Sequence, residues 1–215
     1  MGDWPGGTIM TKTPKEPAAP ENGGRGRKNV EAKLIRAACA LLSKRGPRAL
    51  TVREIAQHAG VNHGQVHHYF KGKKVLLTAA MRTLAREHWE NTAARDRDEH
   101  DVPPPLALAQ DQEYILAVIR CVVDGEMDLA TLELEDGISV PRRIVNELIV
   151  DPDFDYTPAQ VKAVAATFMT AELSWAVFGQ YILKMIDADA AEAAEVEAAI
   201  ARTSRIFLDN PDLLV

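Results

Sequence analysis

Two helix starts with a very short connection between them constrain the fold of this chain more than any other feature. Gly46-Pro47 ends a preceding helical segment, because glycine adopts the left-handed cap conformation and proline cannot continue a helix. Thr51-Val52-Arg53-Glu54 then has the spacing of a capping box. That helix ends at Ala59-Gly60, and Asn62 is a favourable N-cap for the next one. The sequence therefore predicts a helix-turn-helix with a three-residue turn.

The rest of the chain also has helical periodicity. Apolar residues recur every three or four positions from Val30 to Leu42, and a longer helix is predicted to run to roughly Asp98. Further helices are predicted over Tyr114–Val123, after the cap at Thr157, and from Asp187 or Asp189 to Leu208. No convincing strand pattern occurs, so the predicted fold is all-α.

Composition divides the chain into three parts. Residues 1–28 are rich in Pro, Gly, Thr and Lys and are predicted to form a disordered basic arm. Residues 29–75 form the predicted three-helix, helix-turn-helix domain, and residues 76–215 a C-terminal helical domain. Residues 25–74 carry 12 Lys and Arg against 2 Asp and Glu, whereas residues 101–215 carry 7 against 21. A polyanionic partner is expected for the basic part.

Cysteine use and hydropathy favour a cytoplasmic protein. Cys39 and Cys121 have no zinc-ligand spacing and are expected to be small core residues in a reducing compartment. No secretory signal is recognisable. The longest apolar tract, Ala163–Leu183, includes Glu172 and Gln180, so it is predicted to be a buried core helix and no membrane partner is expected.

The stretch GVNHGQVHHYFKGKK, residues 60–74, holds three of the six histidines. His63 and His67 are four residues apart and could share a metal, but His68 points about 100° away from His67 on a helix. No cysteine or carboxylate is near enough in sequence to complete a site. Neither metal binding nor acid–base catalysis is therefore expected, and no cofactor is predicted.

A helical wheel places Val66, Tyr69 and Phe70 on the inner side of this helix. The outer residues are uncharged or imidazole groups that donate and accept hydrogen bonds, as a major-groove reader requires. They are Gly64, Gln65, His67 and His68, with His63 at the helix start. Phosphate-binding groups flank them at Thr51, Lys71, Lys73 and Lys74. The sequence thus favours double-stranded DNA as a partner over a merely solvated polar face.

The segment LTVREIAQHAGVNHGQVHHYFKGKKVLL resembles the N-terminal DNA-binding domain of the TetR family of transcriptional regulators. The matching positions are Thr51, Ile55-Ala56, Ala59-Gly60-Val61, Gly64, Val66, Tyr69-Phe70, Lys73 and Leu76-Leu77. The resemblance covers about residues 29–79. The chain departs from it at His67, where the family usually has Tyr, at Asn62, often Ser or Thr, and at Lys74, commonly an acid.

The resemblance implies that Thr51, Tyr69 and Lys73 hold phosphates. Asn62, His63, Gln65, His67 and His68 would face the major groove, and Gly64 would let the backbone approach the duplex. The arm residues Arg25, Arg27 and Lys28 would enter the minor groove or merely aid solubility. Because imidazole gains charge near neutral pH, operator affinity is predicted to rise as the pH falls from about 8 to 6.

For the acidic second half, the resemblance implies a homodimer formed through the last two long helices and one ligand pocket per subunit. Candidate pocket residues are Tyr114, Met127, Phe168, Met169, Glu172, Trp175 and Phe178. Their apolar character suggests a hydrophobic small-molecule effector. Glu172 lies within an apolar stripe and is expected to bond a ligand, cross the dimer interface or pair with Arg120.

The predicted function is a ligand-responsive transcriptional regulator, a repressor that binds a palindromic operator as a dimer and is not an enzyme. Three alternatives remain at this point. They are a transcriptional activator, a helical adaptor that uses the basic face for another partner, and a metal-binding module built on the histidine-rich helix.

Overall fold

The computed structural model describes residues 23–94, 104–152 and 156–210, and every regular element in those ranges is a helix. The first part contains α1 (Gly23–Arg45), α2 (Val52–Ala59), α3 (His63–Phe70) and α4 (Lys73–Ala93). The middle contains the 3-10 helix η1 (Ala107–Gln110), α5 (Gln112–Val123), α6 (Met127–Ala130), α7 (Leu132–Glu135) and α8 (Val140–Val150). The last part contains α9 (Pro158–Met185) and α10 (Ala190–Asp209). The predicted all-α class is confirmed.

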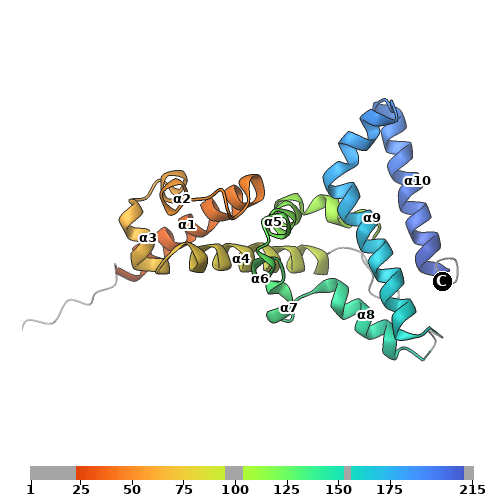
Figure 1. Ribbon diagram of the computed structural model, residues 1–215, viewed down its shortest axis with the longest axis horizontal. Helices are drawn as coiled ribbons and strands as arrows, with labels where there is room; N and C mark the ends of the chain where they lie inside the picture. Colours follow the sequence, from red (N-terminus) through yellow and green to blue (C-terminus); the bar gives the residue numbers. More distant parts are fainter. Residues whose placement is uncertain (1–22, 95–103, 153–155, 211–215) are drawn as a thin grey trace, which may run out of the picture.

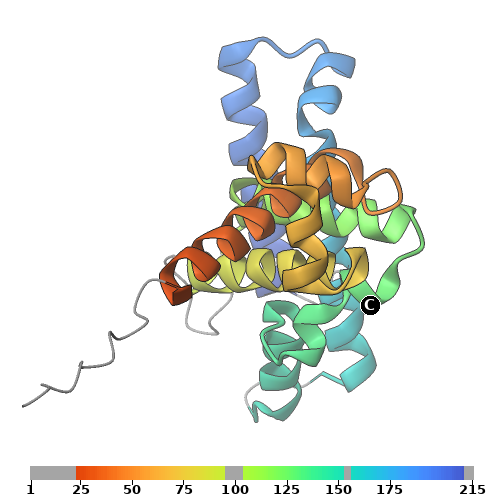
Figure 2. The ribbon, with the colours of Figure 1, turned by 90° about the vertical axis from the view of Figure 1, so that its left-hand side faces the viewer.

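The helices are arranged along one long direction (Figure 1). α1, α2 and α3 gather at one end, and α4 runs from them along the length of the molecule toward α9. α9 and α10 form a long hairpin at the other end. Figure 2 looks onto the end that carries α1–α3, with the hairpin behind it. α4 therefore extends from the α1–α3 end toward the hairpin.

A closed apolar core holds the α1–α4 end together. Leu34, Leu42, Ile55, Val66 and Leu76 have no exposed surface and come from all four helices. Their spacing follows the helical repeat seen in the sequence, which orients one face of each helix inward. Full burial of each such side chain contributes about 1.5–3 kcal/mol to folding. The position of α2 and α3 is thus fixed within a single chain.

The predicted caps of the helix-turn-helix are confirmed. Thr51 and Glu54 form the reciprocal capping box of α2, and Gly60 ends that helix with φ +66°. The Asn62 side chain accepts a hydrogen bond from the Gly64 N–H at 2.9 Å and so caps α3. These short-range bonds satisfy backbone groups that a helix end leaves without intrahelical partners. They also fix the turn between α2 and α3.

The boundaries of α1 and α4 differ from the prediction. α1 begins at Gly23, so Arg27 and Lys28 lie on a helix rather than in a disordered arm. Extension of an existing helix costs little per residue, and Arg and Lys favour helices, so the fold carries α1 past its last core residue. α4 ends at Ala93 rather than near Asp98. The boundary predicted between residues 75 and 76 falls inside α4, and residues 1–22 lie outside the described ranges.

Residues at the end of α5 form hydrogen bonds with the end of α1 and the turn that follows it. Arg120 Nε donates to the Ser43 carbonyl oxygen at 2.7 Å, and the Arg48 backbone N–H donates to Asp124 Oδ2 at 2.8 Å. Gly46, at φ +77°, lies between them, and a Cβ atom there would come within 2.9 Å of Asp124 Oδ2. Of the three roles considered for Glu172, the pair with Arg120 is wrong in this structure, because both residues have other partners. Arg120 caps α1 because α5 crosses the end of that helix.

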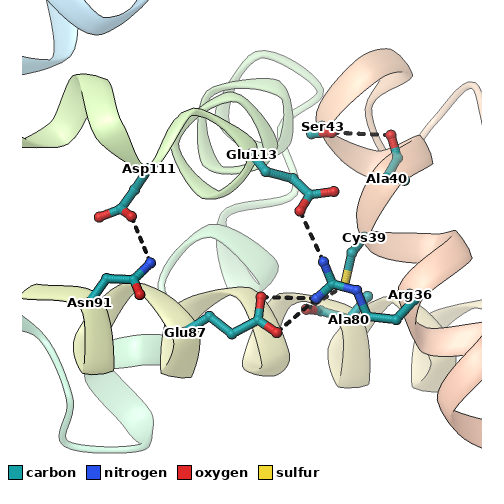
Figure 3. A network of polar contacts seen from close by, with 9 residues as sticks. All are labelled: Arg36, Cys39, Ala40, Ser43, Ala80, Glu87, Asn91, Asp111 and Glu113. Carbon is teal, nitrogen blue, oxygen red and sulfur yellow. Dashed lines mark hydrogen bonds and ion pairs between the residues drawn. The ribbon is translucent and has the colours of Figure 1, made fainter.

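A second set of polar contacts ties α1, α4 and α5 together (Figure 3). Arg36 on α1 donates to both carboxylate oxygens of Glu87 on α4, at 2.8 and 2.9 Å, and to Glu113 on α5 at 3.1 Å. The hydrogen bond to Glu87 raises the pKa of Arg36. Nearby, Asn91 donates to Asp111 at 2.9 Å. The surface pairs are about half exposed, so they orient the helices more than they stabilise them.

Cys39 and Cys121 are core residues, as predicted. Cys39 lies in the α1–α4 contact, where its thiol donates to the Ala80 carbonyl oxygen at 3.5 Å (Figure 3). Burial raises the pKa of each thiol to about 12. Both side chains therefore act as small apolar groups rather than nucleophiles.

α9 is less buried than its sequence predicts. Its capping box at Thr157 is confirmed, but its side chains are buried along one side only. That side comprises Val161, Glu172, Trp175, Gly179 and Leu183. Elsewhere Phe178, Tyr181 and Met185 are 54, 61 and 66 % exposed. In a single chain α9 contacts η1, α5, α8 and α10, and these neighbours leave its other large apolar side chains uncovered.

α9 is also the one helix of the described ranges that is long and apolar enough to cross a membrane by length and composition. Only 17 % of that apolar stretch is buried in the single chain. The stretch is nevertheless interrupted by Glu172, which is buried against the protein and makes hydrogen bonds there.

α10 begins at the Asp189 cap, which selects one of the two predicted starts.

Candidate nucleic-acid interface

α3 presents the predicted polar face outward. Val66 and Phe70 are buried at 0 and 4 % exposure and attach the helix to the core. The exposed residues are Asn62, His63, Gly64, Gln65, His67 and His68. No side chain in this set carries a negative charge, and each except Gly64 offers hydrogen-bonding groups. The face therefore has the chemistry needed to contact base edges in a major groove.

The three histidines do not converge. The His63 and His67 rings are 6.5 Å apart and edge-on, while His68 lies edge-on to the Tyr69 ring at 5.3 Å. Among the described residues, no three His, Cys, Asp or Glu side chains come together as metal ligands. The geometry gives the metal-binding alternative no support.

The start of α2 lies beside this face. The Thr51 hydroxyl donates to Glu54 Oε2 at 2.8 Å and accepts from the Glu54 N–H at 3.2 Å. Arg45 bonds the other Glu54 oxygen at 2.8 Å. The hydrogen bond from Arg45, followed by those from Thr51, lowers the pKa of Glu54 to about 2. Glu54 therefore remains ionised, with its charge balanced by Arg45 where a phosphate would approach Thr51.

A lysine-rich turn borders α3 on the other side. Lys71 adopts φ +51° and ends α3, Gly72 adopts φ +137°, and Lys73 is the first residue of α4. Lys71 and Lys74 are exposed, and Lys73 is half-buried. The Lys74 ammonium is 3.9 Å from Asp128, and both side chains are mostly exposed. Three cations at a helix start form a region that attracts phosphate.

The basic start of α1 reaches the end of α3. The Arg27 guanidinium lies over the Tyr69 ring, 5.8 Å from its centroid. Lys28 is exposed on the same turn of helix. Arg25 lies in the first turn of α1, where only the backbone is described. Arg27 therefore lies against α3, and Lys28 occupies an exposed position on α1.

The predicted effector residues do not form one buried wall. Tyr114, Glu172 and Trp175 are buried, whereas Met127 and Phe178 are 52 and 54 % exposed. Phe168 and Met169 are half-buried on α9. Met127 is exposed because it starts the short helix α6, which follows the tight turn at Gly125.

Glu172 is held by backbone groups. Its carboxylate accepts hydrogen bonds from the N–H groups of Leu106 and Leu108, the latter at 3.2 Å. Burial raises its pKa, and these two hydrogen bonds act in the opposite direction. Glu172 therefore attaches α9 to the segment that contains η1.

The sequence interpretation missed a buried polar cluster between α4 and α5. His88 Nδ1 and Asp111 Oδ2 are 2.7 Å apart, and the His88 ring stacks on Tyr114 at 4.7 Å. The Tyr114 hydroxyl donates to Glu133, which also accepts from Ser139 at 2.9 Å. A polar residue on the apolar stripe of α4 was the available signal, since His88 follows Leu84 by four positions.

The α1–α4 end has the arrangement of a helix-turn-helix DNA-binding domain, and comparison with known proteins agrees. Residues 34–80 match the family described as "Bacterial regulatory proteins, tetR family". The HTH-type transcriptional regulator BetI of Cronobacter sakazakii is 37% identical over 87 residues, 40% of each chain. BetI of Brucella anthropi is 48% identical over 54 residues, 25% of this chain and 28% of its own. The chain thus matches two fifths or less of these relatives.

A tetR-family transcriptional regulator from Streptomyces coelicolor of known crystal structure has the same fold. It superposes with a TM-score of 0.52 at 21% identity, covering 83% of this chain and 89% of that one. Residues 34–80 thus carry the DNA-binding segment of the TetR family, in agreement with the resemblance found in the sequence.

Proposed function

We propose that this protein is a ligand-responsive repressor that binds a palindromic operator as a homodimer in the cytoplasm. The observation that carries the proposal is the outward face of α3. Its exposed residues are neutral or imidazole hydrogen-bonding groups, while the two buried residues Val66 and Phe70 fix the helix to the core. Such a helix can enter a major groove without charge repulsion, and flanking lysines can hold the phosphates.

The open side of α9 supports a dimer. Phe178, Tyr181 and Met185 are exposed along one side of the helix, about 120° from its buried side. A row of large apolar side chains on a soluble protein is costly unless a partner covers it. Two chains joined through this row would hold two copies of α3 in a fixed relation, which is the basis of a palindromic site.

The proposed effector is a small hydrophobic molecule that binds the helical domain beyond α4. The candidate contacts are the buried side chains of Tyr114 and Trp175 and the half-buried side chains of Phe168 and Met169. α4 links such a site to α3, because it contacts both α3 and α5. A thermal-shift screen with lipophilic compounds tests this part, and a compound that raises Tm and releases operator DNA supports it.

The DNA contacts can be sorted with two substitutions. Lys73→Ala should weaken binding to every duplex and lower the salt dependence by about one phosphate contact, because lysine pairs with the backbone. Gln65→Ala should instead relax base preference, at a cost of about 1–3 kcal/mol on the preferred site. Fluorescence anisotropy with an operator selected from random DNA measures both.

Lys162→Ala is the matched control, since Lys162 is an exposed lysine on α9 at the other end of the molecule. It should bind operator as the unchanged chain does. Identical behaviour of the Lys73 and Gln65 variants would contradict the division into phosphate and base contacts.

A further inference from the structure

We infer that the first turns of α1 extend the DNA interface, and that Arg27 and Tyr69 together bind one backbone phosphate. The inference rests on the proposed DNA-binding function and adds a phosphate site made by two helices. It replaces the two sequence interpretations of Arg27, as a minor-groove arm or as a solubilising charge.

The position of Arg27 on α1 follows from helical periodicity. Arg27, Val30, Leu34 and Ala38 are spaced by three and four residues, so they share one face of the helix. Leu34 and Ala38 are fully buried, and Val30 is half-buried where the core ends. Arg27 lies one turn further out on the same face, which directs its side chain toward the helix-turn-helix. Lys28 is turned about 100° away from this face.

The contact between Arg27 and Tyr69 has the geometry of a cation–π pair. The guanidinium carbon is 5.8 Å from the ring centroid, within the range over which such pairs attract. A guanidinium that rests on a ring keeps its N–H donors free at its edge. The neighbouring Tyr69 hydroxyl is a further donor. The two side chains thus present several donors and a positive charge at one place, which suits a phosphate oxygen.

The environment of Tyr69 links this site to base recognition. The His68 ring contacts the Tyr69 ring edge-on at 5.3 Å, and His68 lies on the exposed face of α3. Arg27 restrains Tyr69 from the side of α1 and reduces the number of arrangements open to both rings. A preorganised contact loses less conformational entropy on binding than a mobile one. A phosphate held here would also fix the register of α3 in the groove.

A helical Arg27 is poorly suited to reach into a minor groove. Arms that read a minor groove are extended segments outside the folded domain. Here Arg27 belongs to α1, and its guanidinium is already placed over a residue of the recognition helix. Arg27 is therefore held beside α3 and does not extend away from the folded domain.

The test compares Arg27→Ala with Lys28→Ala, which remove the same charge from adjacent residues. Both variants are titrated with an operator selected from random DNA, at several salt concentrations. Arg27→Ala should lower affinity about 10-fold and reduce the slope of log affinity against log salt by about 0.9 per chain, as expected for one phosphate. Lys28→Ala should lower affinity less than about 3-fold with little change in slope.

A double-mutant cycle with Tyr69→Leu tests the pairing. In that background the effect of Arg27→Ala should shrink to that of Lys28→Ala, because the ring that positions the guanidinium is gone. Equal effects of Arg27→Ala and Lys28→Ala would overturn the inference, as would an Arg27→Ala effect that is unchanged by Tyr69→Leu. An Arg27→Ala effect confined to operators with A·T-rich flanks would also overturn it and indicate a minor-groove contact.

These outcomes separate the inference from the proposed function. Failure of the unchanged chain to bind any duplex would overturn both. Binding by the unchanged chain that is weakened by Lys73→Ala but equally little affected by the Arg27 and Lys28 variants would overturn only the inference. Circular dichroism on each variant checks that α1 remains folded.

Discussion

The α1–α4 end buries its large apolar side chains, whereas the α9–α10 hairpin leaves several of them exposed. In the first, Leu34, Leu42 and Ile55 are completely buried by helices of the same chain. In the second, Phe178 and Tyr181 are more than half exposed although α9 is the longest described helix. The α1–α4 end is thus complete within one chain, whereas the apolar side of α9 is left uncovered, as the proposed homodimer requires.

The largest effect should come from a charge placed on the open side of α9. Tyr181→Asp would put a carboxylate into the proposed dimer interface, where its desolvation is not compensated. We expect a monomer in sedimentation velocity and an operator affinity at least about 100-fold weaker, since one α3 alone makes half of the contacts. Gln180→Asp is the matched control, because the adjacent Gln180 lies on neither the buried nor the open apolar side. Equal effects of the two variants would argue against an interface at Tyr181.

Two glycines test how tightly the turn after α1 is packed. Gly46 and Gly137 have similar backbone angles, φ +77° and +70°, but only Gly46 is tightly packed, against Asp124 and Arg120. Gly137→Ala should cost about 1 kcal/mol of unfolding free energy through backbone strain. Gly46→Ala should cost about 2–4 kcal/mol of unfolding free energy, because the added Cβ would also push Asp124 and Arg120 away from the turn after α1. Urea denaturation measures both costs, and equal costs would show that Asp124 and Arg120 can move aside without loss of stability.

Glu172 offers a test on the buried side of α9. Burial raises its pKa, so the folded state holds the carboxyl proton more tightly than the unfolded state does. This stabilisation is complete below about pH 4 and is lost as the pH rises through the raised folded value. Glu172→Gln removes the titration and one of two hydrogen-bond acceptors, the latter at a cost of about 1 kcal/mol.

The measurement for Glu172 is the difference in unfolding free energy between the unchanged chain and the Gln variant across the acid range. That difference should decrease as the pH rises. A difference that is independent of pH would mean that the carboxylate is stabilised by its two backbone partners as fully as it is by water.

The smallest effect concerns His67 at the DNA-binding end. His67 is exposed on α3, where an imidazole beside a phosphate gains attraction when it is protonated. Operator affinity should rise several-fold as the pH falls from about 8 to 6. His67→Tyr should flatten this profile, and anisotropy titrations across the range measure it. An identical pH profile in the two proteins would show that His67 does not cause the pH dependence of operator affinity.

The sequence predicts the DNA-binding end well because its determinants are local. The Thr51 capping box and the Asn62 cap each depend on residues within three positions. The inward positions of Val66 and Phe70 follow from the helical repeat alone. The exposed recognition residues could therefore be assigned before the packing of the chain was known.

The second half is less predictable because its contacts join distant segments. Charge alone suggested Arg120 as the partner of Glu172, but Arg120 caps α1 and Glu172 bonds the backbone near η1. The His88–Asp111 contact likewise depends on how α4 meets the start of α5. Neither partner choice is encoded within a few residues, since each requires the relative position of whole helices.

The exposure of α9 was mispredicted for a different reason. Its apolar sequence is compatible with a core helix and with a helix that packs between two chains. An apolar helix face predicts burial, but it does not specify whether the same chain or another chain buries it. The single chain leaves Tyr181 and Met185 uncovered.

The most direct test of the central account is to select operator DNA from a random pool and measure how many chains bind each site. A homodimer that binds through both copies of α3 should select an inverted repeat, with half-sites separated by about one helical turn or a multiple of it, bound by an even number of chains. Tyr181→Asp should fail to select such repeats. Selection of a single asymmetric site bound by one chain, or no selection at all, would contradict the account.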